Sequence, residues 1–321
     1  MNYLSMSRKS SNFAGEMKIG VFDSGYGGLT ILEKIRQRLP EYDYLYLGDN
    51  ARAPYGTRSF EVIYEYTLQA VEWLQAQGCR LIILACNTAS AKALRTIQQR
   101  DLPLLNGDAA LNGERLPVTG YGLRVLGVIR PTVEYVIANG AKHIGIMATP
   151  GTVSSNSYVM ELKKVESQKS KVESEALGTP INVESSALVI SQVACPMWVP
   201  LIEAGEHNSD GADYFVKKYI SELVQKDDQL DTIILGCTHY PLLLPKISAE
   251  VAQRLSDCKV VCQGDIVAAS LKDYLGRHPE IASDLSHGGT CQYITTESAA
   301  KFRDSASIFL NEPITASHIE F

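Results

Sequence analysis

Short apolar runs alternate along the chain with longer stretches in which apolar residues recur every three or four positions. The runs at 18–22, 81–84 and 233–235 are almost wholly apolar, which is typical of strands buried in a parallel sheet with helices on both faces. Residues 28–39 and 60–77 instead place their apolar side chains on one helical face. The alternation predicts an α/β protein with doubly wound, mainly parallel sheets.

The two halves of the chain resemble each other. The segment "MKIGVFDSGYGG" is similar to "KHIGIMATPGT", and "LIILACNTAS" is similar to "TIILGCTHYP", in the same order. This similarity predicts two pseudo-symmetric domains that face each other across a cleft. We predict a disordered tail at residues 1–16. The first domain, with Cys86, is predicted to comprise residues 17–122 and 264–321, and the second domain, with Cys237, residues 123–263.

Two segments interrupt the alternation. Residues 106–120 are rich in Gly, Asn and Pro, and we interpret them as an exposed loop or linker. Residues 161–175 are highly charged and almost free of large apolar residues. This second segment is therefore predicted to be the solvated end of a helix followed by a loop.

A cysteine ends each of the two similar apolar runs. Cys86 and Cys237 precede small polar residues, and open α/β sheets bind ligands at the carboxyl ends of their strands. A helix that begins directly after a cysteine favours its thiolate form. One thiolate and one thiol on opposite faces of a carbon can remove a proton from one side and return one to the other, which inverts a stereocentre without a cofactor. The alternative is a pair of packed core cysteines, which the matching contexts disfavour.

Polar side chains at other predicted strand ends complete this picture. Asp23 and Ser24 follow the first strand, and the glycines after them allow the backbone to approach a ligand. That loop could also bind phosphate, although it matches neither common nucleotide-binding motif. His239 follows the second cysteine by two positions and can exchange a proton near neutral pH. The loops at 52–59 and 148–158 offer further hydroxyls and amides, or are only turns and helix caps.

Composition bounds the possible partners and the compartment. The net charge is −6 and no basic stripe is present, so nucleic-acid binding is not expected. No apolar stretch approaches the roughly 20 residues that span a bilayer, and no secretory signal is recognisable, so no membrane partner is expected. The 7 cysteines, an odd number without a CxxC pair, indicate reduced thiols in the cytoplasm and no structural zinc site.

Six sequence blocks resemble the glutamate racemases of the cofactor-independent aspartate/glutamate racemase superfamily. In family order they are "IGVFDSGYGGLT", "YLGDNARAPYGTRS", "ACNTASA", "ATPGTVSSNSY", "ACPMWVPLIEAGE" and "LGCTHYPLL". The resemblance implies two similar α/β domains with the active site between them, glutamate as substrate, and neither a metal nor pyridoxal phosphate. It also implies that the product, D-glutamate, feeds peptidoglycan synthesis. We expect a homodimer.

The resemblance assigns roles to residues by position. Cys86 would take the proton from the D-enantiomer and Cys237 from the L-enantiomer, with Asp23 and His239 assisting the nearer thiol and Glu203 accompanying His239. The positions that contact substrate in the family correspond to Asp23, Ser24, Pro54, Tyr55, Gly56, Asn87, Thr88, Thr149, Thr152, Thr238 and His239.

The chain departs from the family pattern in four places, none of which removes a candidate catalytic group. Tyr26 stands where a smaller aliphatic residue is commoner, and Asn50 replaces a usual Thr. The stretches at 106–120 and 166–180 are longer than the pattern requires.

Three alternatives remain open from the sequence. The same fold could act on aspartate or another diacid, as an aspartate racemase or a related enzyme. It could also be a binding protein without catalysis, or a phosphate or nucleotide binder that uses the glycine loop.

Overall fold

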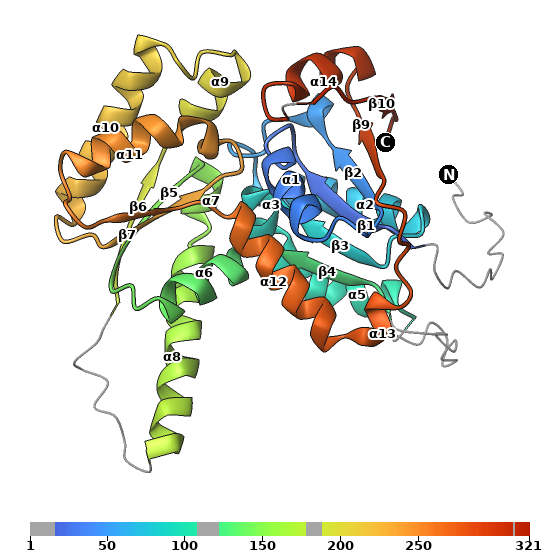
Figure 1. The fold of residues 1–321 in the computed structure, drawn as a ribbon, viewed down its shortest axis with the longest axis horizontal. Coiled ribbons are helices and arrows are strands. Elements are labelled where there is room, and N and C mark those ends of the chain that lie inside the picture. Colours follow the sequence, from blue (N-terminus) through green and yellow to red (C-terminus); the bar gives the residue numbers. More distant parts are fainter. Residues whose placement is uncertain (1–16, 108–121, 178–187, 311) are drawn as a thin grey trace.

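The computed structural model describes residues 17–107, 122–177, 188–310 and 312–321. Within them the chain forms two parallel sheets side by side, each with helices packed against it (Figure 1). The predicted α/β architecture is therefore confirmed. The predicted tail at 1–16 lies outside the described residues, as does most of the predicted loop at 106–120. In the described part of the chain, no helix is both long and apolar enough to cross a membrane.

The first sheet has six strands in the order β10-β9-β2-β1-β3-β4. Their bounds are β1 (Ile19–Asp23), β2 (Tyr44–Gly48), β3 (Leu81–Leu84), β4 (Arg124–Gly127), β9 (Cys291–Thr295) and β10 (Ala316–His318). β4 pairs in parallel with β3, so the chain leaves the first sheet only after Gly127. The predicted start of the second domain at residue 123 is therefore too early, because a short strand precedes the crossover.

The second sheet has four strands in the order β6-β5-β7-β8. Their bounds are β5 (His143–Ala148), β6 (Val189–Ala194), β7 (Thr232–Gly236) and β8 (Lys259–Val261). This order repeats the β2-β1-β3-β4 part of the first sheet. The similar sequence segments occupy equivalent central strands, because β1 pairs with β3 as β5 pairs with β7.

Helices connect the strands throughout the described residues. They are α1 (Leu29–Arg38), α2 (Phe60–Ala76), α3 (Asn87–Lys92), α4 (Leu94–Thr96), α5 (Leu102–Leu105), α6 (Ile129–Ala138), α7 (Pro150–Ser154), α8 (Ser157–Leu177), α9 (Trp198–Glu203), α10 (Asp210–Lys226), α11 (Leu244–Ala252), α12 (Gly264–Arg277), α13 (Pro279–Ala282) and α14 (Ala299–Ala306), with shorter turns η1 (Asn50–Arg52), η2 (Ile97–Asp101) and η4 (Tyr240–Leu243). The first two agree with the helices predicted at 28–39 and 60–77.

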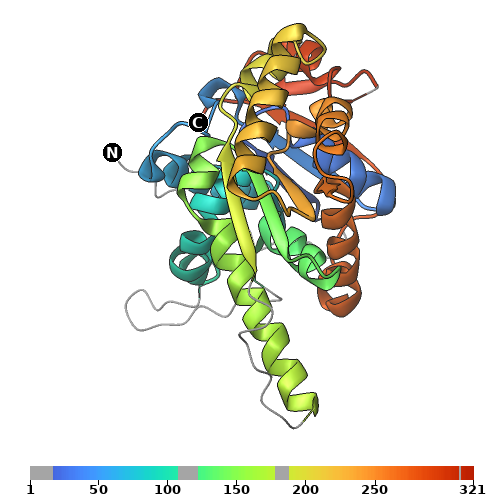
Figure 2. The same ribbon diagram turned by 90° about the vertical axis from the view of Figure 1, so that its left-hand side faces the viewer.

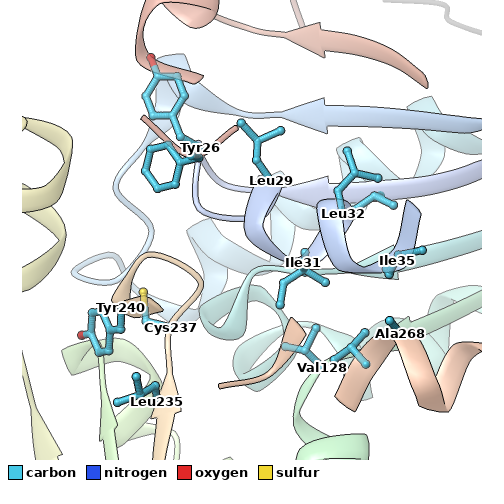
Figure 3. Packing of buried hydrophobic residues seen from close by; sticks show 14 of the residues in the cluster. Tyr26, Leu29, Ile31, Leu32, Ile35, Val128, Leu235, Cys237, Tyr240 and Ala268 are labelled. Carbon is cyan, nitrogen blue, oxygen red and sulfur yellow. The ribbon is translucent and has the colours of Figure 1, made fainter. Parts of the chain in front are cut away.

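Alternate strand residues contribute to different parts of the core. Ile19 and Val21 of β1 belong to the same hydrophobic cluster as Leu32 of α1, whereas Phe22 belongs to the cluster that contains Leu74 of α2. This is the period-2 alternation of a strand covered on both faces. The cluster around α1 continues into the second half through Cys237 and neighbouring side chains (Figure 3).

The charged segment at 161–175 differs from its prediction. It is helical throughout, because α8 continues to Leu177. The end of α8 extends away from the body of the molecule (Figure 2). Leu162 and Val165 of this segment are buried in the same hydrophobic cluster as Val133 of α6. Glu, Lys and Gln are strong helix formers, so the rest of the segment continues the helix. The predicted loop after it falls mostly within 178–187, outside the described residues.

Candidate active site

Both candidate thiols lie at the carboxyl ends of equivalent strands. Cys86 follows β3 by two residues and caps the N-terminus of α3, while Cys237 follows β7 directly. Their residues are only 5% and 6% exposed. The structure therefore holds each sulfur within the protein, at the edge of the sheet where ligands bind in folds of this kind.

The surroundings of Cys86 favour its protonated form. Burial raises the pKa of the Cys86 thiol to about 12, and the nearby carboxyl of Asp23 and the thiol of Cys237 add to this. The Ser24 hydroxyl lies 3.3 Å from Sγ, and the backbone N–H of Ala89 in α3 donates to Sγ at 3.5 Å. These two hydrogen bonds oppose the rise but do not overcome it. The N-terminus of α3 favours the thiolate as predicted, because the N–H of Ala89 lowers the pKa of Cys86, but burial outweighs it.

Asp23 is a buried carboxyl with one free oxygen. Its Oδ2 accepts from the backbone N–H groups of Gly25 and Gly28 at 3.2 and 2.9 Å. Its Oδ1 is buried and accepts no hydrogen bond from any residue that the structure describes. Burial raises the pKa of Asp23, and the charge of His239 from the other half of the protein opposes this rise. The first and second halves thus meet electrostatically at this carboxyl.

His239 links the second thiol to a carboxylate. Its Nδ1 lies 3.9 Å from Sγ of Cys237, and its Nε2 lies 3.0 Å from Oε1 of Glu203 at the end of α9. Burial alone would lower the pKa of His239, but interactions with Cys237 and Glu203 raise it to about 10. The imidazole is therefore a cation over the neutral pH range, placed between a sulfur and a carboxylate.

The glycine loop of the first half packs directly on the histidine loop of the second. A Cβ at Gly27 would lie 2.3 Å from Oγ1 of Thr238 and 2.4 Å from Nδ1 of His239. The Thr30 hydroxyl also donates to the carbonyl of Thr238 at 3.0 Å. Glycine is required at this position because any side chain would separate the two loops.

Three threonine hydroxyls from both halves form a buried cluster. Thr88 lies 2.9 Å from Thr149 and 3.3 Å from Thr152 between their Oγ1 atoms, and Thr149 lies 3.1 Å from Thr152. The N–H of Gly151 donates to the carbonyl of Gly56 at 2.7 Å. Sequence positions in three different blocks are thereby brought together, and each hydroxyl can turn its donor toward an anionic ligand.

The loop before α2 contains three residues, Pro54, Tyr55 and Gly56, that the resemblance assigns to substrate contact. Tyr55 is buried, but its hydroxyl donates to Oδ2 of Asp49, and Pro54 is exposed. Burial and the neighbouring Asp49 carboxylate raise the pKa of Tyr55. The hydroxyl of Tyr55 is therefore engaged within its own half, and Gly56 is the member of this group that contacts the second half.

Two buried residues that the sequence analysis did not select join the cluster around Asn87. The side-chain amide of Asn87 donates to Gln263 at 2.6 Å and accepts from the hydroxyl of Tyr158 at 2.7 Å. These partners are 176 and 71 positions away in the chain. Tyr158 stands in a sequence block that resembles the family, but no local pattern marks it as a partner of Asn87.

A large cavity among the described residues lies away from this site. A cavity of about 650 Å³ lies between α6, the start of β8 and α12, and contains none of the site residues. Among the described residues, no group of three or more His, Cys, Asp or Glu side chains is arranged to hold a metal ion.

Comparison with known proteins identifies the class to which this fold and site correspond. Residues 19–270 match the model of the family described as Asp/Glu/Hydantoin racemase. The chain belongs to this family, which confirms the predicted resemblance and the prediction of an isomerase.

The relatives that it resembles are glutamate racemases. It is 37% identical to the glutamate racemase of Ruegeria sp. (strain TM1040), over 93% of this chain and 98% of that protein. The crystal structure of a glutamate racemase isoform from Bacillus anthracis superposes with a TM-score of 0.76 at 28% identity, covering 95% of this chain and 98% of that one. The glutamate racemase of Francisella tularensis, solved in complex with D-glutamate, gives a TM-score of 0.73 at 27% identity, covering 95% and 98%.

Proposed function

We propose that this protein interconverts L- and D-glutamate by a mechanism with two cysteine bases. The observation that carries the proposal is the presence of two buried thiols, Cys86 and Cys237, on equivalent strand ends of two facing halves. The substrate is proposed from the relatives, which are named glutamate racemases and match nearly their whole length. No cofactor is required by this chemistry.

In the L-to-D direction, Cys237 acts as thiolate and removes the α-proton. The C–H electron pair stays on the substrate as a carbanion, and the protonated thiol of Cys86 delivers its own proton to the opposite face. The turnover leaves Cys237 protonated and Cys86 as thiolate, so the D-to-L direction begins with Cys86 as the base. A proton must return from one thiol to the other before the next L-to-D turnover, by exchange with solvent or with neighbouring acids.

The neighbouring groups suit these opposite roles. The cationic His239 stabilises negative charge on Cys237, and Glu203 holds the imidazole in place. The Oδ1 of Asp23 can accept or return a proton on the Cys86 side, and burial raises the pKa of this carboxyl. Two thiols in different electrostatic surroundings can thus hold different protonation states, as a two-base reaction requires.

Substrate binding is assigned to the strand ends that surround the thiols. The candidate donors include the hydroxyl of Ser24, which lies beside Cys86, and those of Thr88, Thr149 and Thr152, which meet across the two halves. Fixed donors of this kind stabilise carboxylates and the charge that develops on the α-carbon. Because both thiols are almost fully buried, glutamate enters when the halves separate and reacts when they close.

The cellular context is proposed on the same basis. D-glutamate from this reaction would supply peptidoglycan synthesis, and the enzyme would act in the cytoplasm as a homodimer. All seven cysteines are free, in keeping with a reducing compartment. Light scattering of the purified protein tests the dimer, since a monomer mass would contradict it.

Incubation of the purified protein with L-glutamate in heavy water tests the reaction itself. We expect optical rotation to decay to zero while deuterium replaces the α-proton in the D-product. L-aspartate in a parallel reaction should change far more slowly. Retained rotation and retained α-proton with glutamate would contradict the proposal, and faster turnover of aspartate would reassign the substrate.

A further inference from the structure

Tyr158 of α8 lies between the two segments that carry the thiols. Its side chain is fully buried, although it is neither a proposed base nor a proposed substrate contact. The hydroxyl donates to Oδ1 of Asn87, the residue after Cys86, at 2.7 Å. A Cβ placed on Gly236, the residue before Cys237, would lie 3.1 Å from Cε2 of the Tyr158 ring. One side chain therefore touches both thiol-bearing segments.

The hydroxyl end of Tyr158 is fixed by a closed ring of hydrogen bonds. Tyr158 donates to Asn87, Asn87 Nδ2 donates to Gln263 Oε1 at 2.6 Å, and Gln263 Nε2 donates back to the Tyr158 hydroxyl at 2.9 Å. Gln263 Nε2 is also 3.0 Å from the hydroxyl of Thr132. All of these residues are buried, so breaking one bond leaves polar groups without partners.

The ring edge next to the hydroxyl of Tyr158 packs against the second segment. Gly236 is the last residue of β7, and its missing side chain lets the aromatic ring pack against the backbone. The neighbouring Cys237 contributes to raising the pKa of Tyr158, after burial, which is consistent with this proximity. The phenol is rigid and has few rotatable bonds, and its hydroxyl and the adjacent ring edge are held by the two segments.

We propose that Tyr158 is a positioning residue that sets the separation of Cys86 and Cys237. The inference rests on the proposed racemisation, which requires both sulfurs to reach one carbon from opposite sides. A misplacement of about 1 Å can cost on the order of 100-fold in rate when reacting groups must be aligned. Tyr158 and Gln263 then act through the backbone segments that they hold and do not touch the reacting atoms.

The test compares two buried tyrosines that each lose only a hydroxyl. Tyr158→Phe keeps the ring against Gly236 and opens the hydrogen-bonded ring. Tyr44→Phe is the matched control, because Tyr44 is also buried and donates to the carbonyl of Leu39 at 2.6 Å, far from either thiol. Both variants should lose similar thermal stability, measured by circular dichroism.

We expect Tyr158→Phe to lose at least about fivefold in kcat per folded molecule, with KM changed by less than about threefold, while Tyr44→Phe keeps its kcat. Gln263→Met, which opens the same ring from its other side, should lose kcat in the same way. A kcat loss under about fivefold in Tyr158→Phe, a loss seen only in KM, or an equal loss in Tyr44→Phe would overturn the inference.

This result is separable from the fate of the proposed function. If the wild-type protein does not racemise glutamate, the proposed function fails before any variant is compared. If the wild-type protein racemises glutamate and Tyr158→Phe does so equally well, only the role of Tyr158 fails.

Discussion

At the residue scale, burial decides the protonation states on which the proposed reaction depends. Cys86 and Asp23 have raised pKa values because the protein removes both from water. His239 is equally buried, yet its pKa rises because Cys237 and Glu203 stabilise its cationic form more than burial opposes it. The same low-dielectric interior thus gives a neutral thiol on one side and a charged imidazole on the other.

Removal of one thiol should leave exchange on one side only. Cys86→Ala should abolish racemisation, yet it should still exchange the α-proton of L-glutamate in heavy water with retention, because Cys237 can remove and return a proton from its own face. Cys237→Ala should instead exchange only D-glutamate. Proton NMR measures both exchanges, and the double variant is the control for background. Equal exchange of both enantiomers by either single variant would contradict the two-base assignment.

Glu203→Gln should move the pH dependence that His239 imposes. Without the carboxylate the pKa of His239 falls from about 10, so the alkaline limb of kcat should shift to lower pH. The same pKa shift makes the stability of the folded protein depend on pH. The pKa of His239 in the folded protein lies above its ordinary value of 6.5. The interaction of the imidazolium with Glu203 therefore stabilises the folded state fully below pH 6.5, and this stabilisation is lost as the pH rises through about 10.

The melting temperatures of wild type and Glu203→Gln should therefore differ more at pH 6 than at pH 10.5. NMR of the imidazole protons reports the pKa directly. An unchanged alkaline limb and an unchanged imidazole titration would show that Glu203 does not control this histidine.

At the element scale, strand ends and the loops after them bring the site together. The loop between β1 and α1 supplies the backbone amides that hold Asp23, and its Gly27 packs on Thr238 and His239. Parallel strands place such loops at one edge of each sheet. The two halves therefore meet where the loop that contains Gly27 packs closely against the loop that contains Thr238 and His239.

Gly27→Ala tests this approach. A methyl group within 2.4 Å of buried Thr238 and His239 atoms must push the two loops apart, so we expect at least about a tenfold loss of kcat. Gly276→Ala is the matched control, because Gly276 lies within α12 and an added Cβ would meet no atom of the described residues within 4 Å. That control should be active and more stable by up to about 1 kcal/mol. Steady-state kinetics measure kcat and thermal melts measure stability for both variants. Full activity of Gly27→Ala would show that the loops need not touch.

At the scale of the whole molecule, the two halves are joined through α12 and through the contacts around the thiols. α12 packs against both α1 and α6, after which the chain returns to the first sheet as β9. Both thiols are nearly inaccessible in this arrangement. Under the proposed function, glutamate reaches the thiols when the halves separate and reacts when they close.

Glutamate should protect both halves together from hydrogen exchange. In the Cys86→Ala/Cys237→Ala double variant, which keeps each enantiomer pure, L- or D-glutamate should slow amide exchange at residues 24–28 and at 237–243 at the same time. The physical reason is that a ligand held between the halves stabilises their closed arrangement. Mass spectrometry of peptides measures the effect, with L-lysine as the control. Protection confined to one half would contradict a shared site.

The sequence by itself determined the α/β class, the buried strands, the family and the position of a cysteine at two equivalent strand ends. These features are local, because apolar runs, glycines and the residues that follow them are read in order along the chain. A charged segment was harder to assign, since high helix propensity and the packing of Leu162 and Val165 against α6 kept 161–175 helical. The predicted boundary at residue 123 also assigned the strand β4 to the second domain, although it pairs with β3 of the first sheet.

Only the tertiary structure decided the environments of those residues. The pKa of Cys86 depends on how many atoms surround it, and the helix terminus visible in the sequence proved the weaker influence. Tyr158 meets Asn87 across 71 positions, and Gln263 meets it across 176. Such contacts arise when separate elements pack into one core, and neither periodicity nor spacing within a segment encodes which distant side chains will meet.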